Sequence, residues 1–135
     1  MNSTSLTSTI AVAGQISLTQ VVEIAAAGFR VLVNNRPDGE DPGQPSSAQI
    51  EAAAVAAGLE YYHLPVTAMN FPGLDPVKMA QLFDDESKPV LAFCRSGTRS
   101  ANLWVATRTD ASWRQAAERA QALGYDLSMA ARAKS

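Results

Sequence analysis

The chain has 135 residues, 47% of them hydrophobic, so it is long enough for one hydrophobic core and short for two domains. Its formal net charge is −2 and no segment concentrates Lys and Arg, which argues against a nucleic-acid or membrane-surface partner. We therefore expect small-molecule partners and a single domain over residues 1–135, with a core from about 9 to 124.

Several sequence features are expected to be absent. Residues 1–14 contain no positive segment followed by an apolar run, so no signal peptide is predicted. No stretch approaches the roughly 20 apolar residues of a membrane span, and a cytoplasmic location follows by default. With one cysteine, Cys94, and one histidine, His63, we expect no metal site. No glycine-rich turn indicates a flavin or nicotinamide, so no cofactor is expected.

The first elements alternate between strand and helix. Residues 9–13 can form a short strand, and a capping box from Ser17 to Gln20 predicts a helix that ends at Gly28. The apolar, β-branched run 29–33 is typical of a buried strand. A turn-rich loop, 34–45, follows it.

The pattern continues through the middle of the chain. A second capping box begins an alanine-rich helix predicted over 46–58, and 59–66 is predicted to be a strand. Asp75 followed by proline indicates the N-cap of a helix that continues to Phe83. Residues 89–93 are predicted to be the next strand.

Two further helices are predicted at about 100–108 and 112–124, and no element is assigned from Tyr125 onward. Strands that alternate with helices indicate an α/β fold with a mostly parallel sheet and helices on both faces. Ligands bind beyond the carboxyl ends of the strands in such sheets. The segment after the strand 89–93 therefore lies where chemistry is expected.

That segment reads CRSGTRS and begins with Cys94. The following residues, Arg95, Ser96, Gly97, Thr98 and Arg99, are small or basic, so the backbone can curl and direct its N–H groups inward. The start of the next helix adds a positive dipole end, and together these make an anion cradle. Both features favour the thiolate over the neutral thiol, which predicts a cysteine nucleophile.

The loop resembles those of two related groups of cysteine enzymes. Rhodanese-type sulfurtransferases carry a loop that begins Cys-Arg-x-Gly-x-Arg, as Cys94 to Arg99 does. The similar loop of the protein-tyrosine-phosphatase superfamily is one residue longer and usually has His before Cys, where this chain has Phe93. The sequence around the cysteine is thus closer to the rhodanese pattern.

Over residues 10–108 the chain is similar to the beta-lactamase-hydrolase-like, phosphatase-like domain family, also named a sulfur transferase family. The motifs that carry the resemblance are Gly14-Gln15, the segments 33–40 and 63–66, and CRSGTRSANLW. The resemblance implies a three-layer fold like that of dual-specificity phosphatases, with about four to five strands.

Two reactions remain open. A cysteine phosphatase usually takes its general acid from the loop corresponding to residues 67–71, which here contains no carboxylate. Asp75 is better explained as a helix cap, and Asp38 is a substitute from another loop. Sulfur transfer needs no acid, because sulfite or a thiolate leaves as a stable anion. We therefore expect a sulfurtransferase that forms a Cys94 persulfide from thiosulfate or glutathione persulfide, with a phosphatase as the alternative and a non-catalytic anion-binding module third.

Other residues receive secondary roles. Arg36 either contacts a second anionic part of the substrate or is a solvated loop residue. Asn34 and Asn35 are expected to hydrogen-bond the loop backbone, and Ser100 to cap a helix or contact the Cys94 thiolate. His63 is given a structural role. The two tryptophans, Trp104 and Trp113, are expected in the core or at a subunit contact. The sequence therefore leaves open whether the chain forms a homo-oligomer.

Overall fold

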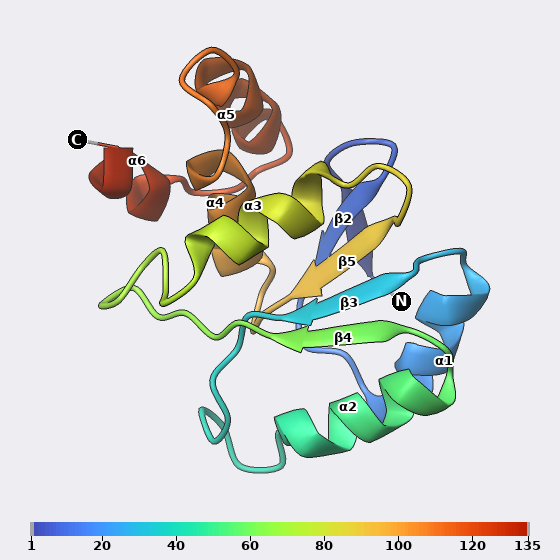
Figure 1. Cartoon of the computed structure of the whole chain (residues 1–135). Coiled ribbons are helices and arrows are strands. Elements are labelled where there is room, and N and C mark those ends of the chain that lie inside the picture. The colour runs from blue at the N-terminus through green and yellow to red at the C-terminus, as the bar shows by residue number, and fades with distance from the viewer. Residues whose placement is uncertain (1, 135) are drawn as a thin grey trace.

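A five-stranded sheet lies between two layers of helices in the computed structural model, which describes residues 2–134 (Figure 1). The strands are β1 (Ser3–Ser5), β2 (Ile10–Ala13), β3 (Val31–Asn34), β4 (Glu60–His63) and β5 (Val90–Phe93). The helices are α1 (Leu18–Ala26), α2 (Ser47–Ala56), α3 (Pro76–Asp84), α4 (Thr98–Ala106), α5 (Trp113–Ala122) and α6 (Ser128–Lys134). The predicted α/β class is confirmed.

The sheet order is β1-β2-β5-β3-β4, and β2, β5, β3 and β4 are mutually parallel. β5 is the last strand in the chain and lies between β2 and β3 at the centre of the sheet. β1 pairs antiparallel with β2 at one edge and was not predicted. Its sequence, STS, is polar and largely exposed, so it lacks the apolar signal by which the other strands are recognised.

Alternate residues of the central strands pack against different helical layers, because side chains in a strand point to opposite faces. On one face, Val12, Val33 and Ala92 belong to a core that includes residues of α3, α4 and α5. On the other face, Leu32 and Phe93 pack with α1 and α2. Burial of both faces explains why these strands are short, continuous apolar runs.

The helix starts are mostly as predicted. Both capping boxes are present, with Ser17 and Ser46 each accepting from the backbone three residues on. Asp75 accepts a hydrogen bond from the backbone of Lys78 at 3.0 Å. No helix within residues 2–134 has the length and apolarity to cross a membrane.

Three boundaries differ from the prediction. The strand predicted at 59–66 covers only Glu60–His63, although the N–H groups of Leu64 and Val66 still donate to the carbonyls of Asn34 and Asn35. α4 begins at Thr98 with Gly97 at its N-cap, so Ser100 lies inside the helix. The tail after Tyr125 contains α6, which packs against α4 through Ala130, a residue with no exposed surface.

Candidate active site

Four loops meet at the carboxyl edge of the sheet because the parallel strands end in register. Phe93 pairs with Ala13 on one side and Asn34 on the other, and Asn34 pairs with His63. The residues that follow these strand ends therefore emerge side by side. They are Gly14, Asn35, Leu64 and Cys94.

Cys94 is fully buried at the start of the β5–α4 loop. Its Sγ accepts a hydrogen bond from the backbone N–H of Gly97 at 3.1 Å. Gly97 has a φ of 92°, in the left-handed region that favours glycine, and this turn directs its amide to the sulfur. The sulfur is thus oriented by an amide of its own loop, and the role of Cys94 as the nucleophile stays a prediction.

The first turn of α4 offers further donors. Within residues 2–134, the N–H groups of Ser96, Arg99 and Ser100 have no protein acceptor. The N–H of Thr98 donates to Ser96 Oγ at 3.5 Å, and the Ser96 hydroxyl donates in turn to Thr98 Oγ1 at 3.1 Å. The amides of Ser96, Arg99 and Ser100 lie at the positive end of the helix dipole, and the anion cradle expected from the sequence stays a prediction.

Arg99 is held in place by Glu40 from the β3–α2 loop. Its Nη1 and Nη2 donate to Glu40 Oε2 and Oε1 at 2.8 and 2.7 Å, and Nη1 also donates to Val66 O at 2.9 Å. The hydrogen bonds from Arg99 chiefly, and then Arg36, hold the pKa of Glu40 at about 2 although burial opposes them. The pKa of Arg99 is raised, first by Glu40 and also by the adjacent Cys94. Arg99 therefore interacts with both the carboxylate and the sulfur.

Arg36 is buried rather than solvated, with 2% of its surface exposed, so the solvated-loop interpretation was wrong. Its Nε donates to Glu40 at 2.8 Å, its Nη2 to Asp41 at 2.6 Å, and its Nη1 to Gln15 at 2.9 Å. The carbonyl of Arg36 accepts from His63 Nε2 at 2.9 Å. The expected structural role of His63 is consistent with this contact, and Arg36 braces the β3–α2 loop from inside.

Arg95 extends the same network to the surface. Its side chain is 68% exposed, and its Nε lies 3.4 Å from Asp41 Oδ2. Three arginines, Arg36, Arg95 and Arg99, thus share the adjacent carboxylates of Glu40 and Asp41. The network ties the β3–α2 loop to the loop that carries Cys94.

Buried amide and hydroxyl groups fix the base of the site. Ser100 Oγ donates to Asn35 Oδ1 at 2.8 Å, and Asn35 Nδ2 donates to Leu64 O at 2.9 Å. Asn34 Oδ1 accepts from the backbone of Arg36 at 2.9 Å, which confirms the predicted role of the two asparagines. The prediction for Ser100 was wrong, because its hydroxyl neither caps the helix nor contacts the sulfur.

Two carboxylates considered as acids have structural partners. Asp38 Oδ1 accepts from the backbone of Ser47 at 2.7 Å and so caps α2. Asp75 caps α3 as described above. The sequence reasoning quoted Glu40 only within a motif and missed its role. The signal available was its position four residues after Arg36, in a loop that returns to the carboxyl edge.

Gly14 was also quoted only as part of a motif. A Cβ added to it would lie 3.0 Å from Arg95 O, so a larger residue would fit only if the Cys94 loop shifted by a few tenths of an ångström. The backbone N–H of Gln15 donates to the same oxygen at 3.2 Å. The β2–α1 connection is therefore one wall of the Cys94 loop.

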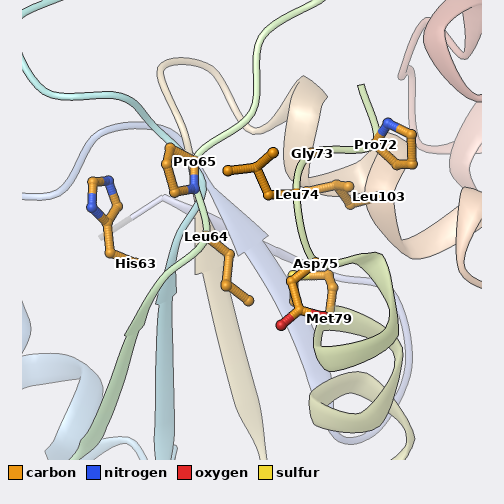
Figure 2. Close-up of a pocket in the computed structure, with 9 residues that line it drawn as sticks. All are labelled: His63, Leu64, Pro65, Pro72, Gly73, Leu74, Asp75, Met79 and Leu103. Carbon is orange, nitrogen blue, oxygen red and sulfur yellow. The ribbon is translucent and has the colours of Figure 1, made fainter. Parts of the chain in front are cut away.

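A mainly apolar pocket of about 240 Å³ lies beneath the connection between β4 and α3. Figure 2 shows Pro65, Leu74 and Leu103 close together, with the ring of His63 apart from them. Leu103 lies one helical turn after Arg99, so this pocket borders the site and does not enclose Cys94. The lining residues are His63, Leu64, Pro65, Pro72, Gly73, Leu74, Asp75, Met79 and Leu103.

Comparison with known proteins identifies the family. The profile described as "Beta-lactamase hydrolase-like protein, phosphatase-like domain" matches residues 3–111. A beta-lactamase hydrolase-like protein of Agrobacterium fabrum (strain C58) is 38% identical over 96 residues, which are 71% of this chain and 22% of that protein. The chain spans between 22% and 27% of the length of the curated relatives that it matches.

Solved structures with the same fold include a candidate phosphatase from Neisseria meningitidis Z2491. It is 32% identical with a TM-score of 0.75, and the alignment covers 96% of this chain and 94% of that one. Tk-PTP in its active form is 20% identical with a TM-score of 0.74, covering 97% of this chain and 92% of the other. The latter likeness shows the fold alone, and it confirms the phosphatase-like architecture implied by the sequence resemblance.

Proposed function

The chain belongs to the phosphatase-like domain family of beta-lactamase hydrolase-like proteins, and on that premise we propose that it hydrolyses phosphate esters through a phosphocysteine at Cys94. The description of the related Neisseria protein as a candidate phosphatase supports this reaction. One observation carries the proposal: Arg99, oriented by Glu40, lies beside a sulfur that a loop amide already contacts. The preference drawn from the sequence, which placed sulfur transfer first, is reversed.

The proposed reaction has two displacements at phosphorus. The Cys94 thiolate attacks the phosphorus of the ester, the S–P bond forms, and the P–O bond to the leaving group breaks. Water then attacks the phosphocysteine, the P–S bond breaks, and the thiolate is restored. Both protons of that water end on the released dihydrogen phosphate, so the cycle balances without an oxidant or a metal.

The remaining residues bind and orient the phosphoryl group. The free amides of Ser96, Arg99 and Ser100 and the Arg99 guanidinium are positioned to bind its three oxygens, whose charge develops in the transition state. Arg99 is suited to this because a planar guanidinium can hold Glu40 on one edge and an oxyanion on another. Arg95, largely exposed, attracts the dianionic substrate.

The direct test is to trap the intermediate. Wild-type protein is mixed with p-nitrophenyl phosphate, quenched in acid and analysed by intact mass, with the Cys94→Ser variant as the control. We expect a phosphoryl adduct on wild type alone, together with phosphate release that the variant lacks. Equal phosphate release by both proteins would contradict the proposal.

Sulfur transfer remains a second candidate on one observation. Four residues separate Cys94 from Arg99, as in the rhodanese-type loop, and a tighter ring suits one sulfur atom better than a phosphate group. The names of the family and of the related structures do not indicate this activity. Intact mass after exposure to thiosulfate tests it, because a gain of one sulfur on Cys94 would identify a persulfide.

A further inference from the structure

Every carboxylate at the carboxyl edge of the sheet has a structural partner. In residues 2–134, the loops that follow β2, β3, β4 and β5 contain only four acidic side chains. A fifth, Asp126, follows Tyr125, whose hydroxyl lies 3.6 Å from where a Cβ on Gly97 would be. The loop acids are Asp38, Glu40, Asp41 and Asp75.

Three of the five carboxylates accept a hydrogen bond from a backbone N–H in the first turn of a helix. Asp38 accepts from Ser47 at the start of α2, and Asp75 from Lys78 in α3. Asp126 accepts from the backbone and the hydroxyl of Ser128 at 2.8 and 2.6 Å. Each of these three carboxylates thus already accepts a backbone N–H group at the start of a helix.

The other two are bound by arginines. Glu40 accepts from both Arg99 and Arg36, and Asp41 accepts from Arg36 and lies against Arg95. Protonating either carboxylate would weaken its charged hydrogen bonds to arginine, and two of these arginines, Arg36 and Arg99, have side chains that are at least 80% buried. These two carboxylates are therefore placed to orient the three arginines.

The segment that supplies the acid in related phosphatases has no such group here. In residues 67–71, Asn70 Oδ1 accepts from the backbone of Thr67 at 2.7 Å, and the amide of Asn70 returns to Thr67 Oγ1 at 3.3 Å. The turn is closed by its own hydrogen bonds. His63 also has a structural partner, because its Nε2 donates a hydrogen bond to the carbonyl of Arg36.

We infer that the P–O bond breaks without protonation by a side chain, so the substrates are phosphate esters whose leaving oxygen is stable as an anion. Phenolic, enolic and acyl phosphates belong to this class, and simple alkyl phosphates do not. The inference rests on the proposed function. The mainly apolar pocket that borders the site suits an apolar group attached to the leaving oxygen (Figure 2).

The charge balance of the first step is consistent with this class. The thiolate and the ester dianion give the phosphocysteine dianion and a leaving oxyanion, with no proton moved. General acid catalysis typically contributes about 10²- to 10⁴-fold, so its absence penalises a basic alkoxide most and an acidic phenolate least.

The experiment measures kcat/KM for a series of substituted phenyl phosphates and one alkyl phosphate at a single pH. We expect a steep fall as the leaving group becomes more basic, with the alkyl ester at least about 10²-fold below p-nitrophenyl phosphate. Values within about 10-fold across the whole series would overturn the inference.

Two variants, Asp41→Asn and His63→Gln, complete the test. We expect each variant to lower kcat/KM for all esters by a similar factor, so that the dependence of kcat/KM on the basicity of the leaving group stays as steep as in wild type. A series that is shallow in wild type and becomes steep in one variant would identify that residue as the acid and overturn the inference. Hydrolysis that Cys94→Ser retains, or no hydrolysis of any ester, would instead overturn the proposed function itself, and the inference with it.

Discussion

Replacing Glu40 with glutamine tests the ion-pair network, since the amide keeps the shape of the side chain and removes its charge. Holding the pKa of this carboxyl at about 2 instead of 4.5 corresponds to about 3.4 kcal/mol at 1.36 kcal/mol per pKa unit. The side chain is 27% exposed, and screening by water reduces this value. We expect Glu40→Gln to lower the free energy of unfolding by about 1–2 kcal/mol at pH 7.

The sign of the pH dependence follows from the lowered pKa. A carboxyl with a lower pKa in the folded state stabilises fully above its unfolded pKa, near 4.5, and this stabilisation is lost as pH falls towards about 2. Urea unfolding gives the difference in the free energy of unfolding between wild type and Glu40→Gln. We expect this difference to be less than half as large at about pH 3 as at pH 7. A difference that does not shrink would refute the assigned ion pairs.

Glu60→Gln is the matched control. Glu60 also lies in an ion pair, 2.8 Å from Lys88, but on the surface and at the opposite end of the sheet, where both side chains are about 40% exposed. We expect it to cost under about 1 kcal/mol and to leave turnover unchanged. Glu40→Gln should lower kcat/KM by roughly 10-fold or more, because Arg99 loses its bidentate partner. Wild-type kcat/KM in Glu40→Gln would contradict its role in positioning Arg99.

Three other substitutions probe the loop itself. Cys94→Ser should abolish turnover while circular dichroism and the melting temperature stay close to wild type, because a hydroxyl is nearly isosteric but far less ionised; retained turnover would make Cys94 structural. Ser100→Ala leaves the Asn35 carbonyl oxygen buried without its donor and should cost about 1–3 kcal/mol in urea unfolding; a neutral result would show that water replaces the hydroxyl. Gly14→Ala places a methyl group against the carbonyl oxygen of Arg95 and should lower kcat/KM more than stability, unless the loop shifts without consequence.

Local patterns in the sequence were sufficient for most of the fold. Three of the four parallel strands, β2, β3 and β5, are short, largely apolar runs because both faces of each are covered. The capping boxes at Ser17 and Ser46 fixed two helix starts. The loop at Cys94 could be placed because a strand must end before it and a helix must follow. These signals depend only on residues a few positions apart.

The contacts inside the site could not be found in this way. Arg99 and Glu40 are 59 residues apart, and Ser100 and Asn35 are 65 residues apart, so no spacing rule joins them. The sheet order brings these pairs together, and that order depends on which strand takes the central position. From the sequence, Asp38 was considered as a substitute acid and Glu40 was given no role. Only their contacts in the structure, Asp38 with the start of α2 and Glu40 with Arg99, show what each does.

The central position of β5 has a consequence for how the molecule is made. Its neighbours, β2 and β3, are synthesised first, but neither can pair with the other, because the strand that belongs between them ends at residue 93. The parallel sheet therefore closes late, through contacts between distant parts of the chain, and such closure is slow relative to local helix formation. Cys94 is the next residue to follow. Until that last strand is inserted, the loop that holds Cys94 is not in place, so the proposed nucleophile is positioned in the same event that completes the core.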